Sequence, residues 1–179
     1  MVPRPVTTRP QGDTVSVIET APPTIHRGEG DLPFVDIGEG VTLQLLQVDL
    51  AMGVWVLRNR FEPDTTIQTH RHTGHVYAFT QSGSWHYLES PDAVNRAGSY
   101  LYEPAGSTHT LHVPATNDET TDVSFIIHGA NLNLDDNGQV EMVIDAHTIL
   151  DFYRALCADQ HGLADPPVVV VQSTPDVLA

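Results

Sequence analysis

Short apolar runs alternate with turn-forming residues along most of this chain. The runs are rich in Val, Ile, Leu, Tyr and Thr, and most are separated by Gly, Pro, Asn or Asp, as in Glu62-Pro63-Asp64, Ser90-Pro91-Asp92 and Pro104-Ala105-Gly106. Many short strands at this spacing, with little helical pattern between them, predict an all-β sandwich or barrel. The predicted strands are Thr14–Ile18, Val41–Val48, Gly53–Arg58, Val76–Glu89, Gly98–Glu103, His109–Val113 and Asp122–His128.

One segment near the C-terminus has helical spacing instead. Between about residues 146 and 160 the apolar positions Ile149, Phe152, Tyr153 and Leu156 fall on one helical face. Asp145 is the expected N-cap and Gly162 the expected C-terminal stop. We expect this helix to pack on the outside of the barrel.

The pattern predicts a single domain over residues 14–172, because there is no internal repeat and the length suits one domain. Residues 1–13 and 173–179 are expected to be flexible tails. The apolar run Val168–Val171 is expected to add an edge strand.

The charge balance limits the possible partners. There are 8 Lys and Arg residues against 23 Asp and Glu, a formal net charge of −15, so nucleic acid and anionic membranes are not expected to bind. No apolar run approaches the ~20 residues of a membrane-spanning helix, and Met1–Asp13 does not resemble a signal peptide. The single cysteine, Cys157, excludes an intramolecular disulfide and a cysteine-rich zinc site. We therefore expect a cytoplasmic protein, in which any metal has imidazole and oxygen ligands.

Three of the ten histidines have a spacing that suggests metal binding. His70 and His72 stand two residues apart, so on a strand both point to the same face. An ion needs at least one further ligand, and His109 is the candidate, because it follows the turn Pro104-Ala105-Gly106 and leads into a predicted strand.

The residues around these histidines resemble the two motifs of the cupins. His70-Arg71-His72 and Gly83 match the first motif, and the second motif is matched by Gly98, Pro104, Gly106 and His109. The first motif usually contains a metal-binding Glu, but counting back from Gly83 puts Val76 at that position. The resemblance therefore implies a cupin double-stranded β-helix, a jelly-roll barrel, with a three-histidine site formed by His70, His72 and His109.

The stretches His70-Arg71-His72-Thr73-Gly74 and Tyr102-Glu103-Pro104-Ala105-Gly106 are similar to those of 2,4'-dihydroxyacetophenone dioxygenase, and the site resembles that of the acetylacetone-cleaving dioxygenase. This resemblance implies a non-haem iron(II) dioxygenase that uses O2 to cleave a C–C bond of a small hydroxyketone or β-dicarbonyl compound. Zinc, nickel or manganese could occupy the same imidazoles. Two alternatives stay open: a metal-binding sensor or regulatory cupin, and a non-redox isomerase or lyase.

Other residues near the motifs are weaker candidates. Glu103 could be a fourth ligand, a catalytic base or a hydrogen-bond partner of a ligand imidazole, or else a solvated turn residue. His75 could be an alternative ligand or a proton donor next to the ligands, although an ordinary loop or strand residue is the simpler interpretation. His86 and His112 are interpreted as structural, and Arg71 should point away from the metal. Tyr77, Phe79, Trp85, Tyr100 and Tyr102 are expected in the core, with some of them lining a pocket.

The quaternary structure can also be predicted. Cupins commonly pair, and exposed sheet edges need cover. We expect a homodimer, with Val168–Val171 as a candidate for that cover.

Overall fold

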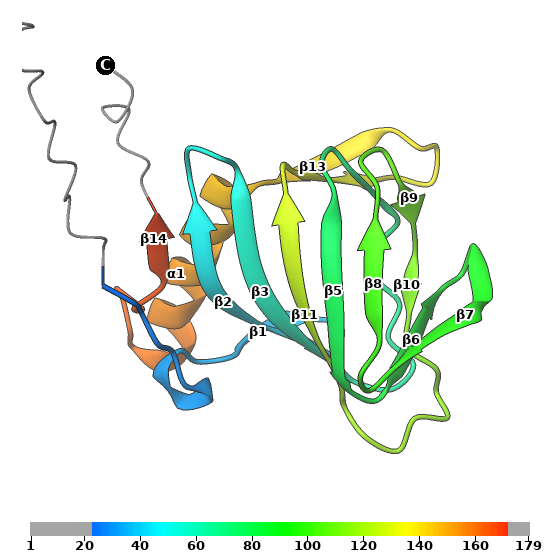
Figure 1. Cartoon of the computed structure of the whole chain (residues 1–179), viewed down its shortest axis with the longest axis horizontal. Coiled ribbons are helices and arrows are strands. Elements are labelled where there is room, and N and C mark those ends of the chain that lie inside the picture. Colours follow the sequence, from blue (N-terminus) through cyan, green and yellow to red (C-terminus); the bar gives the residue numbers. More distant parts are fainter. Residues whose placement is uncertain (1–22, 172–179) are drawn as a thin grey trace, which may run out of the picture.

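The computed structural model describes residues 23–171 and is an all-β barrel with one α-helix, as predicted (Figure 1). The predicted tails and the predicted strand Thr14–Ile18 lie outside the described residues. The elements are η1 (Glu29–Asp31), β1 (Val35–Gly38), β2 (Val41–Asp49), β3 (Val54–Phe61), β4 (His70–His72), β5 (Val76–Ser82), β6 (Ser84–Tyr87), β7 (Ser90–Arg96), β8 (Tyr100–Glu103), β9 (Thr108–His109), β10 (Leu111–His112), β11 (Thr121–His128), β12 (Asn131–Leu134), β13 (Val140–Ile144), α1 (Ala146–His161) and β14 (Val169–Val171).

A seven-stranded sheet forms one wall of the barrel. Its strand order is β1-β2-β3-β11-β5-β8, and β14 runs parallel to β2. Side chains alternate across this sheet, so that Trp55, Leu57 and Phe125 are buried inside while Arg58 and Tyr77 lie outside. This alternation places the hydrophobic core between the large sheet and the elements opposite it.

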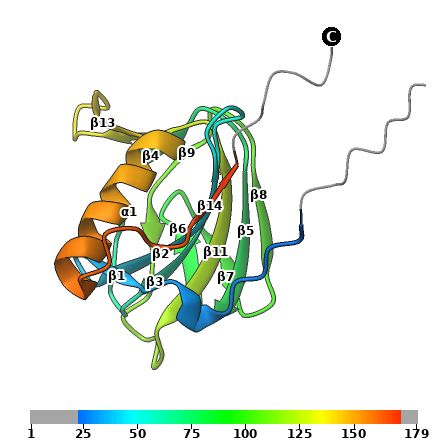
Figure 2. The same cartoon turned by 90° about the vertical axis from the view of Figure 1, so that its left-hand side faces the viewer.

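Two smaller sheets complete the barrel. Their strand orders are β10-β6-β7 and β13-β12-β4-β9. Turned by 90°, the molecule shows these strands facing the long strands of the large sheet across the interior (Figure 2). The second small sheet carries the predicted ligand strand β4 in its middle, with β12 on one side and β9 on the other.

Helix α1 begins and ends where the sequence predicts. The Asp145 side chain accepts hydrogen bonds from the backbone N–H groups of His147 and Thr148, and Gly162 ends the helix with a φ of 66°. The helix lies beside β1 and β2 (Figure 2) and buries Ile149 and Tyr153. Its predicted amphipathic pattern therefore reflects real packing against the barrel.

One predicted turn is wrong. Ser90-Pro91-Asp92 does not separate two strands, because it begins β7, and the chain reverses at Leu88 and Glu89 instead. Strand β7 is the edge of its sheet, where the missing N–H of Pro91 can face away from the ladder. Proline at an edge strand was thus mistaken for proline in a turn.

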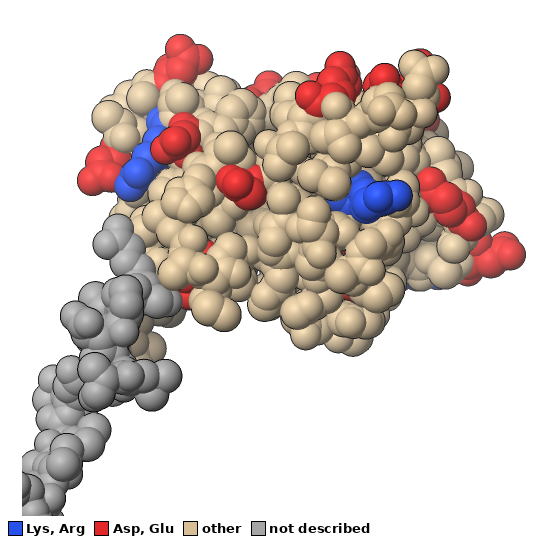
Figure 3. Space-filling model, turned by 90° about the horizontal axis from the view of Figure 1, so that it is seen from above, with Lys and Arg blue, Asp and Glu red and all other residues tan. Residues whose placement is uncertain are grey.

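Carboxylates are scattered over the face seen in Figure 3, with few basic side chains between them. This agrees with the net charge of the sequence. No helix within residues 23–171 is long and apolar enough to cross a membrane.

Candidate metal centre

Strand β4 presents two imidazoles to the barrel interior. His70 and His72 are buried while Arg71 between them is exposed, as the strand periodicity predicts. The Arg71 guanidinium points away from the interior and donates to Thr108 Oγ1 at 3.3 Å. The Nδ1 of His70 lies 3.0 Å from the carbonyl oxygen of Gln68. Donation from Nδ1 to this carbonyl leaves Nε2 of His70 as the nitrogen able to bind an ion.

The third imidazole comes from the neighbouring strand. His109 on β9 pairs directly with His70 on β4 in an antiparallel register. The turn before it is tied to β4, because the Gly106 N–H donates to the His72 carbonyl at 2.8 Å and the His72 N–H donates to Ser107 at 3.0 Å. Gly106 has a φ of 86°, a conformation that glycine adopts without strain. The second cupin motif therefore forms a turn that places His109 next to His70 on β4.

The three imidazoles form one compact cluster. Their ring centroids are 4.8 to 5.0 Å apart, and each residue offers a nitrogen such that all three nitrogens lie within 4.8 Å of one another. His72 Nε2 and His109 Nε2 are only 3.0 Å apart. His70, His72 and His109 could together hold a metal ion.

Glu103 lies at the same cluster. Its carboxylate Oε2 is 2.9 Å from His72 Nε2 and 3.2 Å from His109 Nε2, and its side chain is only 3 % exposed. The interpretation of Glu103 as a solvated turn residue is therefore wrong. Glu103 on β8 is the direct cross-strand partner of Val76 on β5, the position where many cupins carry their metal-binding Glu. The carboxylate thus reaches the cluster from the adjacent strand.

Tyr87 also contacts the cluster, although no motif in the sequence singles it out. Its hydroxyl donates to Glu103 Oε1 at 2.5 Å, and its ring stacks on His109 with 3.8 Å between centroids. Burial, together with the adjacent carboxylate, raises the pKa of Tyr87 well above its usual value, so it stays a hydrogen-bond donor. Tyr87 stands two residues after the buried Trp85 on β6, so strand periodicity directs both side chains to the interior. This spacing was the signal in the sequence for an inward side chain.

The ionisation states suit a cation. Burial lowers the pKa of His70 to about 4, so its imidazole is neutral at pH 7. For Glu103, burial acts to raise the pKa, but the imidazoles of His109 and His72 outweigh it and hold the pKa well below the usual range. The site therefore offers the neutral imidazole of His70 and one ionised carboxylate.

The buried polar atoms fit a divalent metal ion. Glu103 Oε2 is buried without a hydrogen bond, although two ring nitrogens lie within 3.2 Å of it. Mutual separations of about 3 Å are those of neighbouring ligand atoms around an ion bound at about 2.1 Å. A shared ion would satisfy the carboxylate and the facing nitrogens together.

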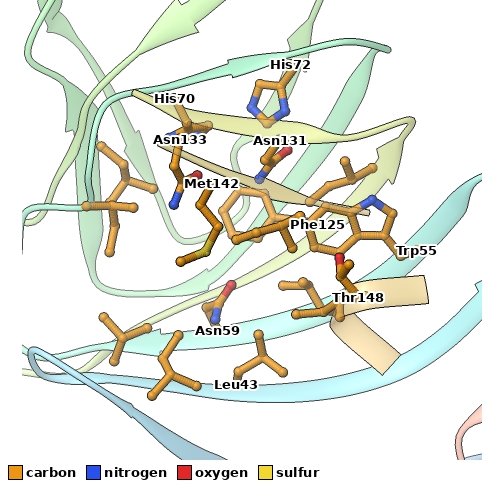
Figure 4. Close-up of a pocket in the computed structure, with 18 of the residues that line it drawn as sticks. Leu43, Trp55, Asn59, His70, His72, Phe125, Asn131, Asn133, Met142 and Thr148 are labelled. Atoms are coloured by element: carbon orange, nitrogen blue, oxygen red, sulfur yellow. The ribbon is translucent and has the colours of Figure 1, made fainter. Parts of the chain in front are cut away.

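A large cavity opens from the cluster. Its volume is about 590 Å³, and its lining includes His70, His72 and Glu103 at one end. Figure 4 shows Asn131 and Asn133 beside these histidines and Asn59 and Leu43 across the cavity. Its remaining lining is mostly apolar and aromatic, which is typical of small-molecule sites.

The C-terminal elements border the opening of this cavity. Met142 and Val143 of β13 and Phe152 of α1 line the cavity yet are about half exposed. Thr148 and Ile149 of α1 line it as well. The expectation that the helix only packs on the outside of the barrel is therefore incomplete, because one face of α1 forms part of the cavity wall.

The other predicted residues lie elsewhere. His75 stacks on His128 at 3.9 Å and is not in the cluster, and His112 contacts Thr66 and the ring of His86.

Trp85 is in the core as expected. The expectation that Tyr77, Phe79, Tyr100 and Tyr102 are core residues is wrong, because they lie on the outer face of β5 and β8, where alternation directs them to solvent.

Comparison with known proteins agrees with the fold. Residues 25–131 match the family model of the ChrR cupin-like domain. The chain belongs to this cupin family. A cupin-like protein of unknown function from Ralstonia eutropha JMP134 is 31 % identical, with a TM-score of 0.72 over 87 % of this chain and 99 % of that one. An RmlC-like cupin from the same organism is 27 % identical, with a TM-score of 0.76 over 83 % of this chain and 95 % of that one.

A more distant cupin has a named activity. The acetylacetone dioxygenase of Acinetobacter johnsonii is 20 % identical, with a TM-score of 0.65 over 76 % of this chain and 94 % of that one. At this identity the likeness shows a shared fold. No curated protein matches the sequence.

Proposed function

We propose that this cupin is a non-haem iron(II) dioxygenase that cleaves a C–C bond of a small hydroxyketone or β-dicarbonyl compound. The observation that carries the proposal is the histidine cluster with Glu103 at the end of an apolar cavity. A bound divalent ion would supply Lewis-acid chemistry toward two substrate oxygens and bring the substrate together with O2.

The overall reaction balances with O2 as the only co-substrate. For a hydroxyketone, the bond between the two oxygenated carbons breaks and each of these carbons gains one oxygen atom from O2. The products are two carboxylic acids. No further oxidant or reductant is needed.

The protein's own residues have distinct roles in this proposal. His70, His72 and His109 hold the ion, and the Gln68 carbonyl orients His70. A carboxylate with a strongly lowered pKa is a weak base, so we assign to Glu103 a charge-balancing role at the ion rather than proton abstraction. Tyr87 holds Glu103 through its hydroxyl. The apolar cavity wall excludes water from the bound substrate.

The test is oxygen consumption by protein purified without air and loaded with iron(II). Metal analysis should find iron(II) bound, and uptake of O2 should depend on a hydroxyketone or diketone from a panel of both. The His112→Ala variant is the matched control and should retain this uptake, because His112 lies outside the cluster. No uptake by the iron-loaded protein with any member of the panel would refute the dioxygenase and favour the sensor or the isomerase or lyase.

A further inference from the structure

The cavity is much larger than a small diketone needs. Its volume of about 590 Å³ lies within the ~300–1,000 Å³ of pockets that hold drug-sized ligands. Figure 4 shows it extending from His70 and His72 to Asn59 and Leu43, with Trp55 and Phe125 along its side. A ligand bound at the histidine cluster therefore has room for a substantial arm that reaches toward Asn59.

No cationic side chain lines this cavity among the described residues. The chain has no lysine, and arginines do not occur in the cavity wall. Arg58 and Arg60 point outside, where both pair with Asp122. A carboxylate or phosphate on the arm of a ligand would lose its hydration here without gaining a partner, which is strongly unfavourable. The wall therefore selects an uncharged arm.

A buried polar group on β12 is free to contact a ligand. Asn131 on β12 pairs directly with His72 on β4, so its side chain faces the same interior as the histidine cluster. Its Oδ1 is buried and makes no hydrogen bond. By contrast, the neighbouring Asn133 donates to Gln68 Oε1 at 3.2 Å. A buried amide oxygen without a partner accepts a hydrogen bond, and the hydroxyl of a hydroxyketone bound at the cluster would donate it.

We propose that the substrate binds the metal through oxygens at one end and fills the cavity with an uncharged apolar arm, and that Asn131 is a positioning residue for the metal-binding end. This inference rests on the proposed function for the identity of the metal-binding end. The size and polarity of the arm rest on the cavity itself.

The test measures binding rather than turnover, with protein loaded with redox-inactive zinc. Calorimetry compares acetylacetone, 1-phenyl-1,3-butanedione and the same phenyl compound with a para-carboxylate. Burial of the phenyl ring should tighten binding about tenfold or more over acetylacetone. The para-carboxylate should weaken binding at least tenfold relative to the phenyl compound. Equal or tighter binding of the carboxylate would overturn the charge selection, and equal binding of acetylacetone would overturn the arm.

Asn131→Leu tests the positioning residue, since leucine keeps the volume but removes the amide. Binding of 2-hydroxy-1-phenylethanone, a phenyl hydroxyketone whose hydroxyl can donate to Asn131 Oδ1, should weaken about tenfold while zinc content stays full. Asn137→Leu is the matched control, because Asn137 is exposed in the loop between β12 and β13, and it should bind as the wild type does. Unchanged affinity in Asn131→Leu would overturn its assignment.

These outcomes separate the inference from the dioxygenase. Selective binding by the zinc protein without oxygen uptake by the iron protein would refute the proposed function and support the inference. Oxygen uptake by the iron protein, together with equal binding of the carboxylated and neutral compounds, would support the proposed function and refute the charge selection.

Discussion

At the scale of single residues, the candidate metal centre depends on three imidazoles from two paired strands. Each of His70→Ala, His72→Ala and His109→Ala should reduce metal affinity by more than tenfold, because each removes one of few ligands. His112→Ala should leave metal content unchanged. Metal analysis after dialysis checks this, and equal loss in the His112 variant or full occupancy without His109 would contradict the assignment.

The burial of His70 makes the metal-free protein sensitive to acid. Its folded-state pKa is about 4, against about 6.5 when exposed in the unfolded chain. The unfolded state therefore binds a proton first as the pH falls. The contribution of His70 to stability is complete above pH 6.5 and decreases by about 3 kcal/mol as the pH falls to 4.

Urea unfolding of the metal-free protein between pH 7.5 and 4 measures this decrease. His70→Gln should make the curve of unfolding free energy against pH flatter than that of the wild type. A slope identical in both proteins would show that other groups control the acid response.

At the scale of elements, the register of β5 and β8 decides where the carboxylate of the site comes from. Because Val76 and Glu103 are direct partners, exchanging them moves the carboxylate by one strand. Glu103→Val should weaken metal binding about tenfold to a hundredfold, and the double variant Val76→Glu/Glu103→Val should regain most of it. Competition with a chelator measures both affinities, and a double variant no better than Glu103→Val would show that position matters more than charge.

Val76→Glu alone gives a different expectation. It adds a second carboxylate beside Glu103, which should retain the metal but suppress turnover, because the new carboxylate competes with the substrate for the ion. Metal content and oxygen uptake of this variant are the measurements. Undiminished turnover in a variant whose new carboxylate is bound to the metal would count against this competition.

The cap of α1 links helix stability to the cavity wall. Asp145→Ala removes the acceptor of two backbone N–H groups and should lower the free energy of unfolding by about 1 kcal/mol. The same change should loosen the turn that carries Thr148 and Ile149 in the cavity wall. Denaturant unfolding and ligand calorimetry on one sample measure the two effects, and Asp151→Ala, an exposed change inside the helix, is the control.

The sequence predicts those features of the site that are determined by residues close together in the chain. Strand alternation around His70 and His72, the caps of α1 and the turn before His109 are all determined by neighbouring residues, and each was predicted correctly. The pairing of Glu103 with Val76, the stack of Tyr87 on His109 and the outward direction of Tyr100 and Tyr102 depend on which strands pair and which face is inside. A single sequence does not contain that information in its local pattern.

At the scale of the whole molecule, the prediction of a homodimer remains to be tested. The run suggested as edge cover was Val168–Val171, and its residues Val169–Val171 form β14, which pairs with β2 of the same chain. Strand β8 pairs only with β5 among the described strands and carries the half-exposed Tyr100 and Tyr102. We expect light scattering to give twice the chain mass of 19.6 kDa, and a monomer mass over a wide concentration range would contradict it.

The proposed metal ligands and the residues at the cavity opening lie in different parts of the chain, and this separation affects how the protein can evolve. The proposed metal ligands all lie within residues 25–131, the stretch that matches the family, while Met142, Val143 and Phe152 at the cavity opening follow it. Substitutions in β13 and α1 can therefore reshape the entrance without touching the proposed ligands. Relatives that share the histidine cluster can therefore bind different small molecules. Directed evolution toward a new small-molecule ligand would best randomise residues 140–152.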